Sequence, residues 1–429
     1  MRKHIYILFI AILAACTAQN TPDVQPTTQA VATQSKSLKR GVAFNFQLTS
    51  DLPLLSPYIS WDYNWGVTTT DISSTWFDSN EMDYCPMIWN NGYLSDMNKN
   101  KVRAYVQAHP TTKYLLGFNE PNLTDQANMI PSKAAETWPQ VVALAKELNL
   151  KLVSPAMNYG TLAGYSDPIK WLDEFFSIDG IDLADIDAIA IHCYMPDATS
   201  LMNYIKRFEK YGKPIWLTEF CAWETNIASA EMQIAYMAEA LNYLEQADMI
   251  ERYAWFIPRY KTEGTYPYMQ LINSQNPAGL TEAGKVYCYF SPFRKDEYLA
   301  TTRMIHAGEY CAVSNNGIQV RPNLDAVGVE LAGKEGLAIV SMSVGDTLTY
   351  HISVPKAAST MSIRYTSFAS SIMEVMLDGY TLGYPSLAST NSISNWQPVA
   401  LNAEIATGQH ELKMILRSGS FRFSGFTIE

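Results

Sequence analysis

The sequence carries little charge, and its excess charge is negative. Only 17% of the 429 residues are charged, and the formal net charge is −11. An acidic surface repels a phosphate backbone, so the composition argues against a nucleic-acid partner. The hydrophobic content of 48% is typical of a well-packed globular protein. A chain of this length exceeds one ordinary core, so we expect two folded domains.

The apolar run at the start of the chain is too short to span a bilayer. It covers residues 5–13 and follows a short basic segment. The next residues, Leu-Ala-Ala-Cys, resemble a bacterial lipobox, which implies that residues 1–16 are a lipoprotein signal peptide and that Cys16 is lipidated. A plain secretory signal with a chance cysteine is the alternative. Residues 17–37, rich in Thr, Gln, Ala and Ser, predict a flexible linker. We therefore expect an exported protein at the periplasmic or cell-surface face, held to the membrane only by its lipid anchor.

Cysteine and glycine do not form the patterns that indicate a zinc or nucleotide site. Five cysteines follow Cys16, which is an odd number, and their spacing does not resemble a zinc site. Export permits disulfides. Cys193 and Cys221 each lie beside a predicted strand end. A disulfide between them and two buried free thiols are therefore alternative predictions. No Gly-rich turn follows the first predicted strand, so a nucleotide site is not supported.

From residue 38 to residue 298, short apolar runs alternate with amphipathic helical windows. The helical windows lie at 132–148, 169–176, 200–211 and 230–247. The predicted strands lie at 41–46, 58–61, 83–89, 114–118, 151–155, 188–193, 215–219 and 253–257. Eight strands alternating with helices predict an α/β fold, a (β/α)8 (TIM) barrel, as the catalytic domain. A doubly wound open sheet is the structural alternative.

After residue 298 the helical windows end and alternating segments begin. Gly and Ser separate the segments, which lie at 317–320, 337–342, 347–354, 361–367, 372–377, 398–405 and 410–417. This pattern predicts an all-β sandwich, jelly-roll-like, over residues 299–429.

Two glutamates each end an apolar run that is typical of a strand. Glu120 ends the fourth predicted strand segment and Glu219 ends the seventh. In a barrel, chemistry gathers at the carboxyl ends of the strands, so we expect the two acids to meet in one pocket. Glycoside hydrolysis needs such a pair, one carboxyl to protonate the leaving oxygen and one to attack or to activate water. Asp62, Asp83 and Glu224 also lie near strand ends, but none has a partner in a matching register.

Four segments near the two glutamates carry a family resemblance. They are Cys-Pro-Met-Ile-Trp at 85–89, Gly-Phe-Asn-Glu-Pro-Asn at 117–122, Ile-His-Cys-Tyr at 191–194, and Tyr-Gly-Lys-Pro-Ile-Trp-Leu-Thr-Glu-Phe at 211–220. Together they resemble glycoside hydrolase family 128, a family of β-1,3-glucanases within the clan of retaining (β/α)8 hydrolases. The resemblance implies an endo-acting β-1,3-glucanase, with carboxyl groups about 5–5.5 Å apart.

The resemblance also implies a role for each residue. Glu120 would be the general acid/base and Glu219 the nucleophile. Asn119 would donate to the sugar 2-hydroxyl, and Tyr194 would keep the nucleophile charged. His192 would line the pocket, and a buried structural histidine is the alternative. Further candidates for sugar contact are Trp255 beneath the cleavage point, Trp61, Trp65 and Trp89 at neighbouring subsites, and Asn45 at the end of the first strand; ordinary packing is the alternative for Trp65.

The C-terminal segments resemble carbohydrate-binding module family 6. The similar segments are 305–310, 317–320, 345–346, 377–379 and 408–412. The resemblance implies a sugar cleft, for which Trp396 is a candidate contact, and a structural calcium ion, for which Glu309 is a candidate ligand. Two features depart from the family: Thr347 replaces a frequent aromatic residue, and residues 420–424 lack the usual cleft asparagine. A domain that only packs on the barrel is the alternative.

Two other functions are open at this point. Another retaining β-glycanase, such as a β-1,4-mannanase or a cellulase, would use the same acid pair, because the pair does not read the linkage. A non-catalytic glycan-binding lipoprotein is the second alternative, and the intact pair of Glu120 and Glu219 argues against it. We expect a β-glucan polysaccharide or oligosaccharide as the substrate, no cofactor or metal in catalysis, and a monomer.

Overall fold

The computed structural model describes residues 36–323 and 336–429. The signal peptide, Cys16 and nearly all of the 17–37 linker lie outside the described residues. By their contacts, Gln34–Glu429 form one compact unit, so the predicted domain boundary at 298–299 falls within this unit. Within the described ranges, no helix has both the length and the apolar character needed to cross a membrane.

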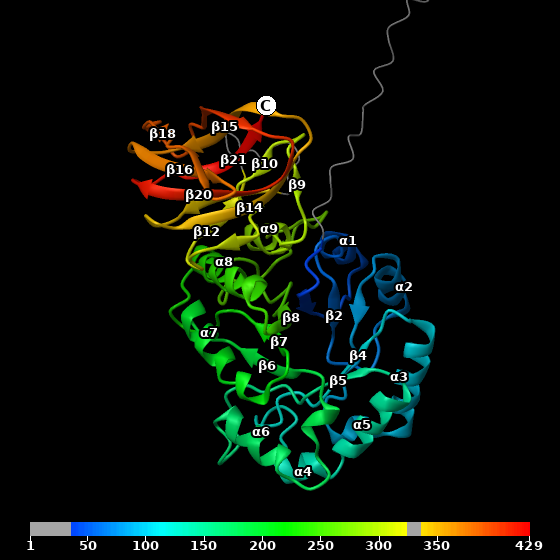
Figure 1. The fold of residues 1–429 in the computed structure, drawn as a ribbon. Coiled ribbons are helices and arrows are strands. Elements are labelled where there is room, and N and C mark those ends of the chain that lie inside the picture. The colour runs from blue at the N-terminus through cyan, green and yellow to red at the C-terminus, as the bar shows by residue number, and fades with distance from the viewer. Residues whose placement is uncertain (1–35, 324–335) are drawn as a thin grey trace, which may run out of the picture. The chain divides into compact units, whose positions relative to one another are not determined.

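Eight parallel strands and the helices around them form the N-terminal region, which confirms the predicted α/β content (Figure 1). Six strands pair in the order β3-β2-β1-β8-β7-β6, and β4 pairs with β5. Single parallel bridges, Met87–Leu116 and Val153–Ala188, connect this pair to its neighbours on both sides. A (β/α)8 barrel requires this strand order. The strands are β1 (Arg40–Ala43), β2 (Trp61–Tyr63), β3 (Asp83–Tyr84), β4 (Tyr114–Leu116), β5 (Lys151–Val153), β6 (Ile189–Cys193), β7 (Ile215–Phe220) and β8 (Ile250–Trp255).

Each predicted window contains a helix and one window is divided, but four helices lie outside every window: Leu52–Leu55, Asp71–Ser79, Asp96–Ala108 and Glu282–Tyr289. The window at 132–148 forms two helices, because Pro139 lacks an N–H and so favours the first turn of a new helix over continuation of the old one. The α-helices are α1 (Leu52–Leu55), α2 (Asp71–Ser79), α3 (Asp96–Ala108), α4 (Pro131–Ala135), α5 (Trp138–Glu147), α6 (Pro168–Phe176), α7 (Ala198–Lys206), α8 (Ala230–Gln246) and α9 (Glu282–Tyr289). Short 3-10 turns are η1 (Thr49–Asp51), η2 (Asn91–Leu94), η3 (Leu183–Asp185) and η4 (Glu209–Tyr211).

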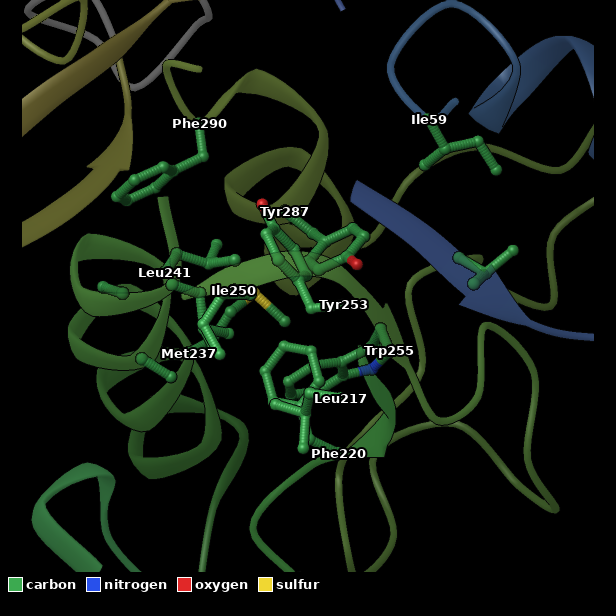
Figure 2. Packing of buried hydrophobic residues seen from close by; sticks show 14 of the residues in the cluster. Ile59, Leu217, Phe220, Met237, Leu241, Ile250, Tyr253, Trp255, Tyr287 and Phe290 are labelled. Atoms are coloured by element: carbon green, nitrogen blue, oxygen red, sulfur yellow. The ribbon is translucent and has the colours of Figure 1, made fainter. Parts of the chain in front are cut away.

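Side chains on the two faces of the parallel strands form two separate cores. The inner core draws on seven of the eight strands and on residues just before or after strands: Ala43, Trp61, Tyr63, Cys85, Met87, Tyr114, Leu116, Val153, Ala156, Ala188, Ala190, Trp216 and Ala254. The outer core lies between strands and helices, and Figure 2 shows the part in which Leu217, Phe220 and Trp255 pack together. Because side chains alternate along a strand, neighbouring residues enter different cores. Cys193 and Cys221 lie in the outer core as buried thiols, so no disulfide joins them.

The residues after 298 form two largely antiparallel sheets, which confirms the predicted change to antiparallel strands. One sheet has the order β12-β13-β21-β15-β19, with β10 on β21. The other has the order β11-β14-β20-β16-β17, with β18 on β16 and β9 parallel to β14. The strands are β9 (Leu299–Ala300), β10 (Ile305–His306), β11 (Ala312–Val313), β12 (Gln319–Pro322), β13 (Leu337–Ser341), β14 (Thr347–Val354), β15 (Ala358–Thr366), β16 (Ser371–Leu377), β17 (Tyr380–Gly383), β18 (Ser386–Leu387), β19 (Gln397–Ile405), β20 (Gly408–Ser418) and β21 (Arg422–Ile428).

Candidate active site

Glu120 and Glu219 meet at the carboxyl ends of the parallel strands. Glu219 lies in β7, and Glu120 lies in the turn after β4. Glu120 has a φ of 45°, a left-handed conformation that few non-glycine residues adopt. Its N–H donates to Ala156 O at 2.9 Å, and its carbonyl accepts from Leu123 N at 3.0 Å, so hydrogen bonds on both sides hold this turn. One carboxylate oxygen of Glu120 lies within 4.8 Å of one of Glu219.

Glu219 receives donors on both carboxylate oxygens. Tyr63 Oη donates to Oε1 at 2.9 Å, and Trp65 Nε1 donates to the same oxygen at 2.8 Å. Tyr194 Oη donates to Oε2. Hydrogen bonds of this kind stabilise the ionised form of a carboxyl group. The surroundings of Glu219 therefore suit a carboxylate held in one orientation.

Glu120 is bound on one oxygen only. Asn158 Nδ2 donates to Oε1 at 3.0 Å, and His192 Nδ1 lies 2.8 Å from the same oxygen. Within residues 36–323 and 336–429, no hydrogen bond reaches Oε2 of Glu120. One oxygen is thus fixed by the protein, and the other is left for a proton and a ligand.

His192 connects the two carboxyl groups. It is fully buried, and its Nδ1 lies 3.2 Å from Glu219 Oε2 as well as 2.8 Å from Glu120 Oε1. Its Nε2 is buried and has no hydrogen-bond partner among the described residues. A hydrogen on Nε2 would be an unpaired buried donor, which costs about 1–3 kcal/mol. The neutral ring therefore carries its hydrogen on Nδ1, and the charged ring carries one there too, so Glu120 Oε1 remains an acceptor in both forms.

Burial and mutual contact shift the pKa values of these three groups. Burial lowers the pKa of His192, but Glu219 and Glu120 together raise it above 6.5. Burial raises the pKa of Glu120, but His192 and Asn158 outweigh it and lower the pKa below 4.5. Burial raises the pKa of Glu219 and Glu120 adds to the rise, which His192, Tyr194 and Trp65 only partly offset. Because the groups are in direct contact, they take up and release protons as a set.

Asn119, next to Glu120, has an unpaired polar atom at the same site. It is 3% exposed, and its Nδ2 donates to Gln126 Oε1 at 3.3 Å. Its Oδ1 is buried without a hydrogen-bond partner among the described residues. A buried amide oxygen without a partner is rare, and a bound ligand is one way to satisfy it.

The same three donor groups could also hold a metal ion. Nδ1 of His192 and one oxygen from each glutamate lie within 4.8 Å of one another. Imidazole and carboxylate are common ligands of divalent transition metals. Such an ion would take the place of the proton that the cluster shares.

Two predicted sugar contacts are wrong. Trp61 and Trp255 are both 0% exposed, so neither has a free face for a sugar ring. Trp61 begins β2 and donates to Lys39 O at 2.9 Å, because the strand runs from 61 to 63 and does not end at 61. Trp255 points into the outer core and donates to Met269 O at 2.8 Å. Phe256, one residue later, points inward in its place.

The remaining predicted contacts lie at or beyond the strand ends. Trp65 and Tyr194 are half-buried and touch Glu219, as described above. Trp89 is half-buried beside Tyr93, with ring centroids 6.2 Å apart, and its carbonyl accepts from Asn119 N at 2.9 Å. Asn45 is exposed beyond β1. No contact of Asn45 with either glutamate is present among the described residues.

Three site residues were not predicted from the sequence: Tyr63, Asn158 and Phe256. The alternation along β2 puts Tyr63 two residues before Trp65 on the same face, a signal that was readable once the strand was placed correctly. Phe256 packs edge-on against Trp65 and Tyr194, with ring centroids 5.9 and 5.4 Å apart. Asn158 lies in the loop after β5, where no periodic pattern marks it.

In the C-terminal region, the predicted calcium ligand and the predicted sugar contact are both engaged by arginine side chains. Arg303 donates to both carboxylate oxygens of Glu309 at 2.8 and 2.6 Å, and His306 N donates to one of them at 2.7 Å. Both oxygens of Glu309 thus accept hydrogen bonds, and the positive charge of Arg303 beside them disfavours a calcium ion at this residue. Trp396 is half-buried, and the guanidinium carbon of Arg364 lies 5.0 Å from its ring centroid, so one ring face is covered.

The site has the parts of a glycoside hydrolase, and comparison with known proteins agrees. The family model of the glycosyl hydrolase catalytic core matches residues 41–287, and the chain belongs to this family. It is similar to the crystal structure of a family GH128 (subgroup II) endo-β-1,3-glucanase from Pseudomonas viridiflava. The sequence identity is 38%, the match covers 59% of this chain and 98% of that one, and the TM-score is 0.53.

Two further relatives agree over the same region. A GH128 (subgroup II) endo-β-1,3-glucanase from Sorangium cellulosum is 33% identical, over 58% of this chain and 97% of that one, with a TM-score of 0.52. Alkali-sensitive linkage protein 1 of Schizosaccharomyces pombe (strain 972) is 29% identical over 265 residues. That match covers 59% of this chain but only 45% of the yeast protein. The predicted resemblance to family GH128 is therefore confirmed for the N-terminal region.

Proposed function

We propose that this protein is a retaining, endo-acting β-1,3-glucanase. The observation that supports specificity for the β-1,3 linkage is the 38% sequence identity to the Pseudomonas viridiflava endo-β-1,3-glucanase, over 98% of that chain. The retaining mechanism is supported by the two buried carboxyl groups. One carboxylate oxygen of Glu120 lies within 4.8 Å of one carboxylate oxygen of Glu219. Retaining enzymes have carboxyl groups about 5–5.5 Å apart, whereas inverting enzymes leave about 6.5–9.5 Å for a water molecule.

Glu219 is the nucleophile in this proposal. Its donors from Tyr63, Trp65 and Tyr194 hold the carboxylate in place, so little reorganisation is needed before it attacks the anomeric carbon. The attack forms a covalent glycosyl-enzyme bond as the bond to the leaving oxygen breaks.

Glu120 is the acid/base. Its Oε2 gives a proton to the leaving oxygen in the first step and takes one from the attacking water in the second. Because the two carboxylates raise the pKa of His192, this cluster holds a proton more tightly than a free imidazole would.

The sugar at the cleavage point would lie between the carboxyl pair and an aromatic wall. Phe256, Trp65 and Trp223 line this wall, with Phe256 and Trp223 ring centroids 5.9 Å apart. Apolar sugar faces pack well on aromatic faces. The buried amide of Asn119 would bind the 2-hydroxyl, a bond that strengthens in the transition state.

Azide rescue tests the two roles with one substrate, 2,4-dinitrophenyl β-laminaribioside. In Glu219→Gly, azide takes the place of the nucleophile and should give the inverted α-glycosyl azide. In Glu120→Ala, azide attacks the glycosyl-enzyme and should give the retained β-glycosyl azide. The opposite pattern of anomers would reverse the assignment of the two glutamates.

A panel of glycans separates this function from its alternatives. We expect reducing ends to be released from laminarin and not from β-1,4-mannan or carboxymethylcellulose. Early products of several lengths from laminarin would support endo action. Release from one of the other polymers would favour another β-glycanase, and binding of laminarin without release would favour a glycan-binding protein.

We also propose, from the N-terminal motif alone, that the protein is exported and anchored through a lipid on Cys16. Labelling of the wild-type chain by a fatty-acid analogue, and its loss in Cys16→Ala, is the expected result. The C-terminal sheets are proposed as a glycan-binding module in which the uncovered face of Trp396 meets a sugar. Trp396→Ala should then reduce retention on insoluble β-1,3-glucan without changing hydrolysis of short oligosaccharides.

A further inference from the structure

The loop after β5 is fastened to the turn that carries Glu120. Asn122 Nδ2 donates to Asn158 O at 2.6 Å, and Leu162 N donates to Asn122 O at 2.9 Å. Gly160 is packed so tightly here that a Cβ would lie 2.5 Å from Asn122 O, which only glycine avoids. The loop and the turn therefore form one rigid piece.

A second set of contacts holds the loop from its outer side. Tyr159 Oη accepts from Arg207 Nη1 at 3.2 Å, and Arg207 pairs with both carboxylate oxygens of Asp167 at 2.7 and 2.8 Å. The Tyr159 ring also lies against Tyr204, with centroids 5.0 Å apart. On the other side of residue 158, Met157 N donates to Ala190 O at 3.1 Å and Met157 O accepts from His192 N at 2.8 Å, so both chain neighbours of Asn158 are held.

The orientation of the Asn158 amide is determined by its own backbone neighbour. Asn158 Oδ1 accepts from Tyr159 N at 2.8 Å, and an N–H group requires an oxygen opposite it. The Nδ2 end must then face Glu120, where it donates to Oε1 at 3.0 Å. The amide carries no charge at any pH, so this donor is present in every protonation state of the site.

We infer that Asn158 is a positioning residue for the acid/base step, on the basis of the function proposed above. With His192 it occupies Glu120 Oε1, and it thereby makes Oε2 the oxygen that exchanges the proton with the glycosidic oxygen. A proton on Oε1 would face two N–H donors, so this carboxyl has one protonation position and one rotamer. Nothing in this role requires Asn158 to touch the substrate.

The test compares two leaving groups in Asn158→Ala and Asn158→Ser. Both variants keep the main-chain oxygen that accepts from Asn122, so the loop retains its fastening. Laminarin needs an acid to release its sugar leaving group, whereas 2,4-dinitrophenolate leaves without one. We expect kcat/KM on laminarin to fall about 10- to 100-fold, the range for loss of one hydrogen bond to a charged group. On 2,4-dinitrophenyl β-laminaribioside, kcat/KM should change less than about threefold.

A pH profile gives a second readout that a structural role would not move. Asn158 helps to lower the pKa of Glu120, so its removal should shift the alkaline limb of kcat/KM on laminarin to higher pH. Asn273→Ala is the matched control, because Asn273 Oδ1 accepts from Gly279 N within its own loop and contacts neither glutamate. Asn273→Ala should change kcat/KM equally on both substrates and leave the alkaline limb of the pH profile unchanged.

The outcomes separate this inference from the function on which it rests. An equal loss on both substrates in both Asn158 variants, or no loss on either, would overturn the role of Asn158. A wild-type chain that hydrolyses the aryl glycoside but not laminarin would instead overturn the proposed linkage. The thermal midpoint of each variant, measured beside the kinetics, identifies any loss that comes from unfolding.

Discussion

The two ends of the parallel strands both bury charged side chains, but they pair them differently. At the amino end, Arg252 lies 2.7 Å from Asp83 and over the rings of Tyr114 and Trp216, 4.4 and 4.6 Å from their centroids. Glu251 accepts there from Trp216 Nε1 at 2.7 Å. At the carboxyl end, two glutamates share one histidine.

The difference shows what each end is suited to do. An arginine paired with a carboxylate and stacked on aromatic rings is neutralised and has one arrangement, which suits a stabilising contact. The Glu120–His192–Glu219 cluster has more carboxyl groups than cations, and Glu120 Oε2 and Asn119 Oδ1 lack protein partners among the described residues. Unsatisfied groups of this kind reduce stability, and they are what a substrate and a mobile proton require.

The largest expected effect is a loss of activity at the carboxyl end of the strands without a loss of stability. Glu219→Gln removes the proposed nucleophile and should lower kcat on laminarin by at least about 10⁴-fold. The same change removes one of two neighbouring negative charges, so the thermal midpoint should stay constant or rise. Initial rates and thermal unfolding on the same preparation measure both. Retained activity, or a large fall in the midpoint, would contradict the contrast between the two ends.

The next largest effect is expected at the amino end of the strands, where a substitution should lower stability and leave activity nearly unchanged. Arg252→Met leaves Asp83 as a buried carboxylate without its cation, which should lower the free energy of unfolding by about 3–5 kcal/mol. The kcat of the folded variant should stay within about threefold of the wild-type value, since the glutamates lie at the other strand end. Urea unfolding and initial rates measure the two quantities.

Arg103→Ala is the control for this prediction. Arg103 pairs with Glu147, and both side chains are more than a third exposed. Loss of a solvent-screened pair at the surface should lower the free energy of unfolding far less than loss of the buried Arg252–Asp83 pair. Equal losses in Arg252→Met and Arg103→Ala would mean that the amino-end pair contributes no more than a surface contact.

A smaller effect tests which core is entered by Trp255, the last residue of β8, and by Phe256, the residue after it. Phe256→Ala removes the ring next to Trp65 and Tyr194 and should lower kcat/KM about 10-fold. Trp255→Phe loses the bond to Met269 O and should lower the free energy of unfolding by about 1–3 kcal/mol, with activity within about threefold. If Trp255→Phe were the variant that lost activity, the inward register of β8 would be wrong.

This pair of residues also shows how far the sequence could predict the structure. Strand alternation and local motifs were sufficient for the α/β order and for the places of Glu120 and Glu219. They did not determine register, and a shift of one residue moves every side chain to the other face, as at Trp255 and Phe256. Asn158 acts through a loop whose shape depends on contacts distant in sequence, which no local pattern encodes.

The smallest effect concerns pH and distinguishes two carriers of the catalytic proton. The proposed mechanism requires Glu219 ionised, and burial raises the pKa of Glu219, so the acid limb of kcat/KM should lie above pH 4.5. If Glu120 alone held the proton, its lowered pKa would put the alkaline limb below pH 4.5 and leave almost no activity. If Glu120 and His192 hold it together, the raised pKa of His192 puts this limb above pH 6.5.

The variants that decide between these carriers are His192→Gln and His109→Gln. If His192 helps to hold the proton, its loss removes the group with the raised pKa, so the alkaline limb should move to lower pH. His109 pairs with Asp78 at 2.7 Å, away from both glutamates, so its loss should leave the limb unchanged. The raised pKa of His192 also adds stability that is complete below pH 6.5 and is lost as the pH rises through the folded-state pKa. Thermal unfolding of wild type and His192→Gln between pH 5 and about pH 9 should therefore converge at the alkaline end. Because His192 lowers the pKa of Glu120, an alkaline limb that moves to higher pH in His192→Gln would assign the proton to Glu120 alone.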